Sequence, residues 1–92
     1  MGWIIKFNSF SEKQLKKLDR NTQKNILNFL EDKIKSSSNP KYIGHSLTGK
    51  LSGLWRYRVG DHRIICEIKN NELAILVIGM GHRKDIYEKF KA

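Results

Sequence analysis

Cysteine is almost absent from this chain, since Cys66 is its single copy. One cysteine cannot form an intramolecular disulfide, and it cannot build a cysteine-based metal site. Its neighbours Ile64, Ile65 and Ile68 predict a buried, inert thiol rather than a reactive one. This use of cysteine indicates a reducing, cytoplasmic setting.

Long apolar runs are also missing. No stretch approaches the ~20 apolar residues of a membrane span, and the apolar start at residues 3–5 is too short for a secretory signal peptide. The sequence therefore predicts no membrane span and no secretory signal. It contains one proline and no repeat, linker or low-complexity tract, so residues 1–92 are predicted to form one domain.

Acidic residues are scarce. Nine Asp and Glu stand against 18 Lys and Arg, which leaves a net charge of +9. Such an excess favours nucleic acid, an anionic membrane or an acidic protein as partner, although scattered lysines are also what a lysine-rich proteome produces. The arginines are not scattered, because four of the five lie in the second half of the chain: Arg56, Arg58, Arg63 and Arg83.

The first half of the chain predicts one strand and two helices. A short strand is expected at residues 3–7, because they are mostly β-branched or aromatic. Ser11 is expected to cap the first helix, with Gln14 completing a capping box. Apolar residues at three- and four-residue spacing extend the second helix to about Lys35. Residues 41–53, which are rich in glycine, are expected to be irregular apart from a short turn.

The second half changes to a period of two, which is typical of strands. Three strands joined by tight turns are predicted, at residues 54–59, 62–69 and 73–80, and a short helix is predicted at residues 84–91. The order strand–helix–helix–strand–strand–strand indicates an α+β domain. Its two helices would pack on one face of a small, mainly antiparallel sheet and leave the opposite face to a ligand.

Three of the arginines are candidates for that opposite face. Arg56 and Arg58 are two apart and so share one face of a strand, and Arg63 begins the next strand after a turn. A guanidinium offers a fixed fork of donors that matches phosphate and keeps its charge. These side chains are therefore predicted to bind a polyanion, and the alternative is that they form surface salt bridges with Asp61 and Glu67.

Aromatic residues alternate with these arginines. Trp55 and Tyr57 share the other face of the same strand. Bases of single-stranded RNA stack on aromatic rings that are interleaved with basic residues. The competing interpretation, that both rings line the core beneath the helices, is the stronger one for a strand covered on one face.

Histidine and tyrosine supply the candidate proton carriers. Two histidines can in principle cleave RNA by acid–base catalysis, whereas their spacing predicts no metal site. His82 is the best candidate, because it lies beside Arg83 just beyond the end of a predicted strand, while His45 and His62 are assigned to structural or surface positions. Tyr87 lies one helical turn beyond Arg83, where it would either transfer a proton or anchor the C-terminal turn.

Two motifs, LWRYRVGDHRII at residues 54–65 and GHRKDIY at residues 81–87, are distinctive in this order. Together with the strand–helix–helix start and Leu47-Thr48-Gly49, they resemble the RelE/ParE superfamily of bacterial and archaeal toxins. The resemblance covers nearly the whole chain, and it is specifically to the RelE-like, ribosome-dependent mRNA interferases.

This resemblance implies the toxin of a type II toxin–antitoxin system. Such a toxin enters the ribosomal A site and cuts the mRNA codon there, so translation stops. The ribose 2′-hydroxyl attacks the adjacent phosphate and leaves a 2′,3′-cyclic phosphate and a 5′-hydroxyl, without a metal or other cofactor. The implied partners are a cognate antitoxin protein, the ribosome and mRNA, and DNA only indirectly through the antitoxin complex.

The resemblance also implies roles for single residues. Arg56 and Arg58 stand where family members place a pair of basic residues, often lysines. Arg63 and Arg83 match arginines that hold the scissile phosphate, and Tyr87 matches a tyrosine near the reacting ribose. Arginine is a poor general base, so the pair at the lysine positions can stabilise charge but cannot readily move a proton.

The identity of the acid and the base therefore stays open, with His82, Lys84 and Tyr87 as the implied helpers. Two other functions remain as alternatives. The ParE branch of the superfamily inhibits DNA gyrase and cuts nothing, although it generally lacks the full set of basic residues and tyrosine. The third reading is an inactive module that only binds an antitoxin.

Overall fold

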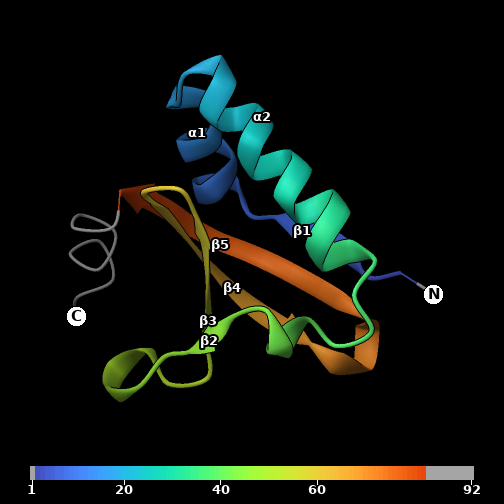
Figure 1. Cartoon of the computed structure of the whole chain (residues 1–92). Helices are drawn as coiled ribbons and strands as arrows, with labels where there is room; N and C mark the ends of the chain where they lie inside the picture. The colour runs from blue at the N-terminus through green and yellow to red at the C-terminus, as the bar shows by residue number, and fades with distance from the viewer. Residues whose placement is uncertain (1, 83–92) are drawn as a thin grey trace.

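Two helices lie on one face of a five-stranded sheet in the computed structural model, which describes residues 2–82 (Figure 1). The helices are α1 (Ser9–Lys17) and α2 (Arg20–Phe29), and the strands are β1 (Ile4–Phe7), β2 (His45–Ser46), β3 (Trp55–Val59), β4 (His62–Lys69) and β5 (Ala74–His82). The strand order is β1-β5-β4-β3-β2, with β1 parallel to β5 and the other pairs antiparallel. The predicted α+β fold is confirmed, and the predicted helix at residues 84–91 lies outside the described residues.

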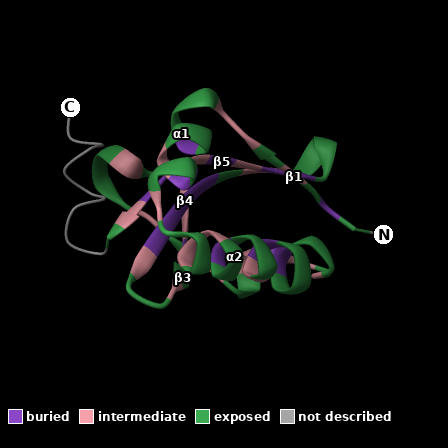
Figure 2. Ribbon diagram, turned by 90° about the horizontal axis from the view of Figure 1, so that it is seen from above, coloured by how far each residue is buried: buried purple, intermediate pink, exposed green. Residues whose placement is uncertain are grey.

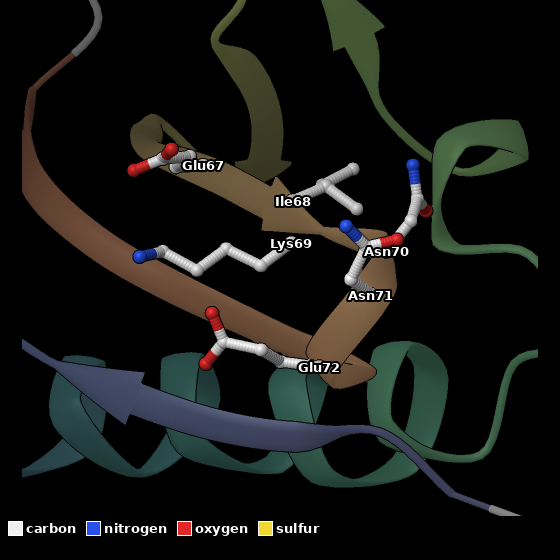
Figure 3. A pocket seen from close by; sticks show the side chains of 6 residues that line it. All are labelled: Glu67, Ile68, Lys69, Asn70, Asn71 and Glu72. Carbon is white, nitrogen blue, oxygen red and sulfur yellow. The ribbon is translucent and has the colours of Figure 1, made fainter.

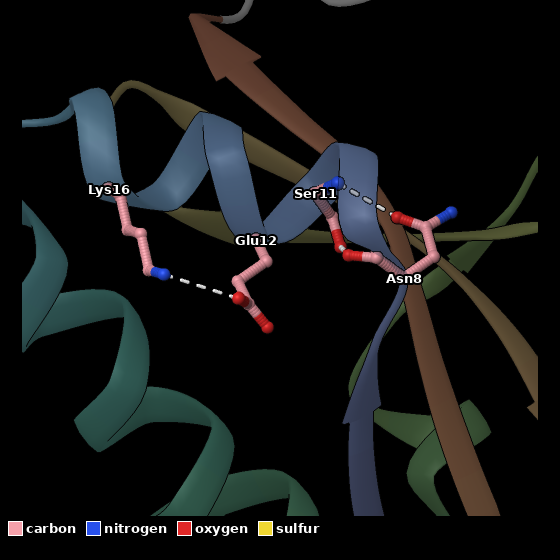
Figure 4. A network of polar contacts seen from close by, with 4 residues as sticks. All are labelled: Asn8, Ser11, Glu12 and Lys16. Atoms are coloured by element: carbon pink, nitrogen blue, oxygen red, sulfur yellow. Dashed lines mark hydrogen bonds and ion pairs between the residues drawn. The ribbon is translucent and has the colours of Figure 1, made fainter.

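The start of α1 differs from the prediction. The cap is Asn8, whose Oδ1 accepts a hydrogen bond from the backbone N–H of Ser11 at 2.8 Å (Figure 4). Ser11 lies inside the helix and is fully buried, and its hydroxyl donates to the Val77 carbonyl of β5 at 2.7 Å. Gln14 accepts a bond from the Met80 N–H at 2.8 Å. The two residues expected to form a capping box therefore attach α1 to the sheet, which a local cap motif cannot reveal.

The second helix changes its winding part-way. After Phe29 it continues as one π-helical segment, Leu30–Lys35, to the end that the sequence predicts. Ile26, Leu30 and Ile34 are four residues apart and at most 1% exposed. Steps of four drift by about 40° each around an α-helix, and the wider π turn offsets this drift. No helix in residues 2–82 is long and apolar enough to cross a bilayer.

The core lies between the helices and the sheet. Figure 2 shows buried segments of α1 and α2 facing buried segments of the strands, with exposed residues outside. Tyr57 is fully buried, and its ring lies 5.9 Å from that of Phe29 between centroids. The other buried members come from both layers: Trp3, Leu15, Ile26, Leu30, Ile34, Ile64, Cys66, Ile75, Val77 and Met80.

A bulge between β4 and β5 keeps the sides of the sheet in register. Cys66 pairs with Val77, but the preceding residue, Ile65, pairs with Gly79, so Ile78 is the extra residue on β5. A slip of one residue without such a bulge would move a core side chain to the other face. With the bulge, Cys66 and Val77 stay in the core.

The segment before β3 is more ordered than predicted. It contains two 3-10 turns, η2 (Pro40–Tyr42) and η3 (Gly49–Leu51), and the two-residue strand β2 lies between them. A hydrogen bond of 2.9 Å from the Leu47 N–H to the Leu54 carbonyl closes this hairpin beyond β2. The expectation that residues 41–53 are irregular is therefore wrong at β2, where pairing with β3 supplies order that local sequence does not.

Candidate functional site

Three of the predicted arginines share one face of the sheet. Arg58 lies directly opposite Arg63 in the pairing of β3 with β4, and Tyr57 lies opposite Ile64. Opposite residues of an antiparallel pair share a face, and Tyr57 and Ile64 belong to the core under the helices. Arg56, Arg58 and Arg63 therefore lie on the side away from α1 and α2, which we call the open face, although Arg63 and Ile65 on this face are almost fully buried.

These arginines differ in how firmly they are held. Arg63 is only 7% exposed, and its Nη1 donates to the carbonyls of Gly60 at 3.4 Å and His62 at 3.3 Å. It therefore braces the turn between β3 and β4. Arg58 is exposed and Arg56 is half-buried. The direct pairing of Arg58 with Arg63 places two guanidinium groups side by side at this end of the two strands.

His45 is on the same face, which the sequence did not indicate. It pairs with Arg56 across β2 and β3, and its side chain is exposed. A strand of two residues is too short to show the alternation of apolar and polar residues, so no signal in the sequence marks β2. Only the pairing of β2 with β3 brings His45 beside the arginines.

The segment that carries His45 is held against the core. The Tyr57 hydroxyl donates to the Pro40 carbonyl at 2.9 Å. Gly44 lies so near the sheet that a Cβ there would be 2.8 Å from Cε1 of Tyr57 and 3.0 Å from the carbonyl oxygen of Arg56. Backbone can approach a ring this closely only where a side chain is missing. The chain therefore enters β2 along a defined path.

His82 lies on the other side of the sheet. It pairs with His62, and the two rings are 6.1 Å apart between centroids in an edge-on arrangement. Both histidines line a hollow with α1 residues, among them Gln14 and Lys17. The structure therefore does not bring His82 together with the three arginines, because His62 and His82 lie on the helix side and Arg63 lies on the open face.

The aromatic residues of β3 belong to the core or its edge. Tyr57 cannot stack on RNA, because it is fully buried. Burial raises the pKa of Tyr57 above its ordinary value, and the neighbouring Cys66 raises it further. Burial also raises the pKa of the Cys66 thiol, in agreement with the predicted inert cysteine. Trp55 is half-buried, and Nζ of Lys41 lies 5.7 Å from the centroid of its ring.

The far end of β4 has a different character. Figure 3 shows a hollow there that is lined by residues 67–72, including the carboxylates of Glu67 and Glu72. Glu72 forms an exposed ion pair with Lys6 at 3.8 Å. The two carboxylates share this hollow with Lys69, so it lacks the excess of positive charge that Arg58 and Arg63 give the other end of the face. Within residues 2–82 no group of three or more His, Cys, Asp and Glu could hold a metal ion.

Two predicted site residues, Arg83 and Tyr87, lie outside the described residues. Arg83 directly follows His82, the last residue of β5. In the pairing of β4 with β5, Gly81 is opposite Arg63 and His82 is opposite His62.

Comparisons with known proteins show the family of the chain. Residues 5–87 match the family model described as the ParE toxin of type II toxin–antitoxin system, parDE. The chain belongs to this family. It is also 24% identical over 89 residues to Toxin RelG of Mycobacterium tuberculosis (strain ATCC 25618 / H37Rv), a match that covers 97% of this chain and 100% of that toxin.

Solved structures of the RelE/ParE superfamily share the fold. The toxin–antitoxin complex RelBE2 from Mycobacterium tuberculosis contains a chain with a TM-score of 0.81 and 20% identity, covering 90% of this chain and 100% of that one. The RelB–RelE antitoxin–toxin complex from Methanococcus jannaschii contains one with a TM-score of 0.70 and 25% identity, covering 94% and 99%. The predicted membership of the RelE/ParE toxin superfamily is confirmed.

Proposed function

We propose that this toxin is a metal-independent endoribonuclease that cuts mRNA in the ribosomal A site and thereby inhibits translation. The observation that carries the proposal is the pair Arg58 and Arg63, directly opposite each other on the face that the helices leave open, with Arg56 on the same face. A scissile phosphate gains negative charge as the 2′-oxygen attacks it. Fixed guanidinium groups at that point stabilise this charge, which is often the largest single term in catalysis.

Each arginine has a part in this proposal. Arg63, held by the carbonyls of Gly60 and His62, is a preorganised donor whose position costs no ordering when RNA binds. Arg58 is exposed and can fold onto a phosphate from the opposite strand. Arg83 and Tyr87 complete the set by their match to the family motif, as a second phosphate ligand and a residue beside the reacting ribose.

The partners follow from the same reasoning. We propose a cognate antitoxin protein, because the solved relatives RelBE2 and RelB–RelE are toxin–antitoxin complexes. The net charge of +9 suits both an acidic antitoxin segment and ribosomal RNA, whose phosphates bind basic surfaces in a salt-sensitive way. Contact with DNA would be indirect, through the antitoxin.

The proposal is tested in a translation extract programmed with a defined mRNA, with cleavage mapped by primer extension. Wild-type protein should cut the message only while ribosomes translate it. Arg58→Ala should slow cleavage by about 10- to 100-fold, because it removes one charged phosphate ligand. Arg20→Ala is the matched control, because Arg20 is an exposed arginine at the start of α2, on the helix layer. An intact message after treatment with the wild-type protein would overturn the proposal.

A second function is supported by the family description itself, which names the ParE toxin. A ParE-like toxin would inhibit DNA gyrase and leave mRNA intact. A gyrase supercoiling assay with the same protein preparation separates the two functions. A protein that neither cuts mRNA, inhibits gyrase, nor slows growth on induction would be an antitoxin-binding module without toxic activity.

A further inference from the structure

The open face has cationic groups but needs a group that moves a proton. Arginine keeps its charge throughout the ordinary pH range, so Arg56, Arg58 and Arg63 cannot take the proton of a ribose hydroxyl. Histidine is the side chain best suited to that task near neutral pH. All three histidines of the chain lie within the described residues, and His62 and His82 are on the helix side of the sheet.

We propose that His45 accepts the proton of the attacking 2′-hydroxyl, an inference that rests on the proposed endoribonuclease function. His45 and Arg56 are directly opposite each other in β2 and β3, a relation that puts their Cβ atoms about 4.5–5.5 Å apart. Arg58 lies two residues further along β3 on the same face, opposite Arg63. A phosphate held by the arginines would therefore have the imidazole at its side, within reach of the neighbouring ribose.

His45 is placed firmly enough for this role. The Tyr57–Pro40 hydrogen bond and the close contact of Gly44 with the Tyr57 ring fix the chain on the N-terminal side of β2. The Leu47–Leu54 backbone bond fixes it on the other side. The imidazole itself is exposed, so its access to RNA is not blocked by these contacts.

The step is a transesterification and is balanced in atoms and charge. A neutral imidazole takes the proton from the 2′-hydroxyl while the 2′-oxygen forms a bond to phosphorus. The bond between phosphorus and the 5′-oxygen breaks, and that oxygen leaves with the electron pair. It takes a proton from water, and the imidazolium of His45 returns its own proton to the resulting hydroxide. The net change is the transfer of one proton from the 2′-oxygen to the 5′-oxygen.

The pH dependence of cleavage reports this step. Among the elements packed against β2 are β3 and η2, whose charged or titratable residues are Arg56, Tyr57, Arg58, Lys41 and Tyr42. Arginine, lysine and tyrosine ordinarily titrate well above neutral pH. A fall in rate on the acidic side of neutrality would therefore be due to histidine.

The experiment measures single-turnover cleavage of ribosome-bound mRNA from about pH 5.5 to 8.5, a range that spans the ordinary titration of histidine. His45→Gln should cut at least about 100-fold more slowly and should lose the acidic fall in rate. His45→Ala should regain activity when imidazole is added. His62→Gln is the matched control on the helix side, and it should keep the wild-type rate and pH profile.

The outcomes separate the two proposals. Wild-type protein that does not cut mRNA would overturn the proposed function and this inference with it. If wild-type protein cuts and His45→Gln cuts equally well, only the role of His45 is overturned. A purely structural role of His45 would also make the His45→Gln variant cut slowly. In that case the variant would keep the acidic fall in rate, imidazole would not restore His45→Ala, and proton transfer by His45 would be overturned. Thermal unfolding of each variant is measured alongside, so that a loss of cleavage rate is not confused with a loss of folded protein.

Discussion

Tyr57 links the core to the segment that carries His45, and removing its hydroxyl tests that link. The Tyr57→Phe substitution keeps the ring, and so keeps the contact with Phe29, but removes the 2.9 Å hydrogen bond to the Pro40 carbonyl. No cavity larger than one oxygen atom is created. The expected result is a moderate loss of stability that comes from this one bond.

The magnitude follows from the surroundings of the two partners. Both the hydroxyl bond and Pro40 are buried, and a buried acceptor that loses its donor costs about 1–3 kcal/mol. The Pro40 carbonyl keeps a weaker bond from the Ile43 N–H at 3.3 Å, so the cost should be at the low end, about 1 kcal/mol. For a domain of this size, that lowers Tm by about 4–8 °C.

Thermal and urea unfolding, followed by circular dichroism, measure the change. Tyr42→Phe is the matched control, because Tyr42 is 85% exposed and loses the same hydroxyl. That variant should remain within about 0.5 kcal/mol of wild type. Amide exchange at Leu47 should be faster in Tyr57→Phe, since β2 would be held less firmly. Equal stability of the two variants would refute the conclusion that the Tyr57 bond anchors this segment.

Three further predictions concern stability. Gly44→Ala should lower the free energy of unfolding by about 1–3 kcal/mol, measured in urea, because its Cβ would be 2.8 Å from the Tyr57 ring; an unchanged midpoint would contradict the close approach. Burial raises the folded-state pKa of Cys66 and Tyr57. The stability that these two neutral side chains contribute is therefore complete while the pH is below their unfolded-state pKa values of about 8.5 and 10. It is lost as pH rises from there towards the folded-state values, by up to about 1.4 kcal/mol per pH unit for each group, and Cys66→Ala should remove the part that begins near pH 8.5. Ser11→Ala should cost about 1 kcal/mol through the lost bond to Val77, and a loss no larger than that of an exposed serine would show that this bond does not hold α1 to β5.

Local pattern predicted most of the elements. The strand over residues 62–69 has the bounds that the alternating sequence predicts, and the second helical segment ends at Lys35 as its apolar spacing indicates. Such patterns work because burial on one face imposes a period of two on strands and of about 3.6 on helices. The cap of α1 was predicted wrongly, because Asn8 and Ser11 are both suitable caps and only contact with β5 decides between them.

The sequence by itself determined which chemistry is present: a cationic chain, arginines at a spacing of two, one inert cysteine and the motifs of a toxin family. The tertiary structure decided which of these groups meet. Strand pairing placed Arg58 opposite Arg63 and His45 opposite Arg56, and it turned His82 to the helix side. Pairing joins residues far apart in the chain, and one position of register exchanges the two faces of a strand, so no local pattern contains this information.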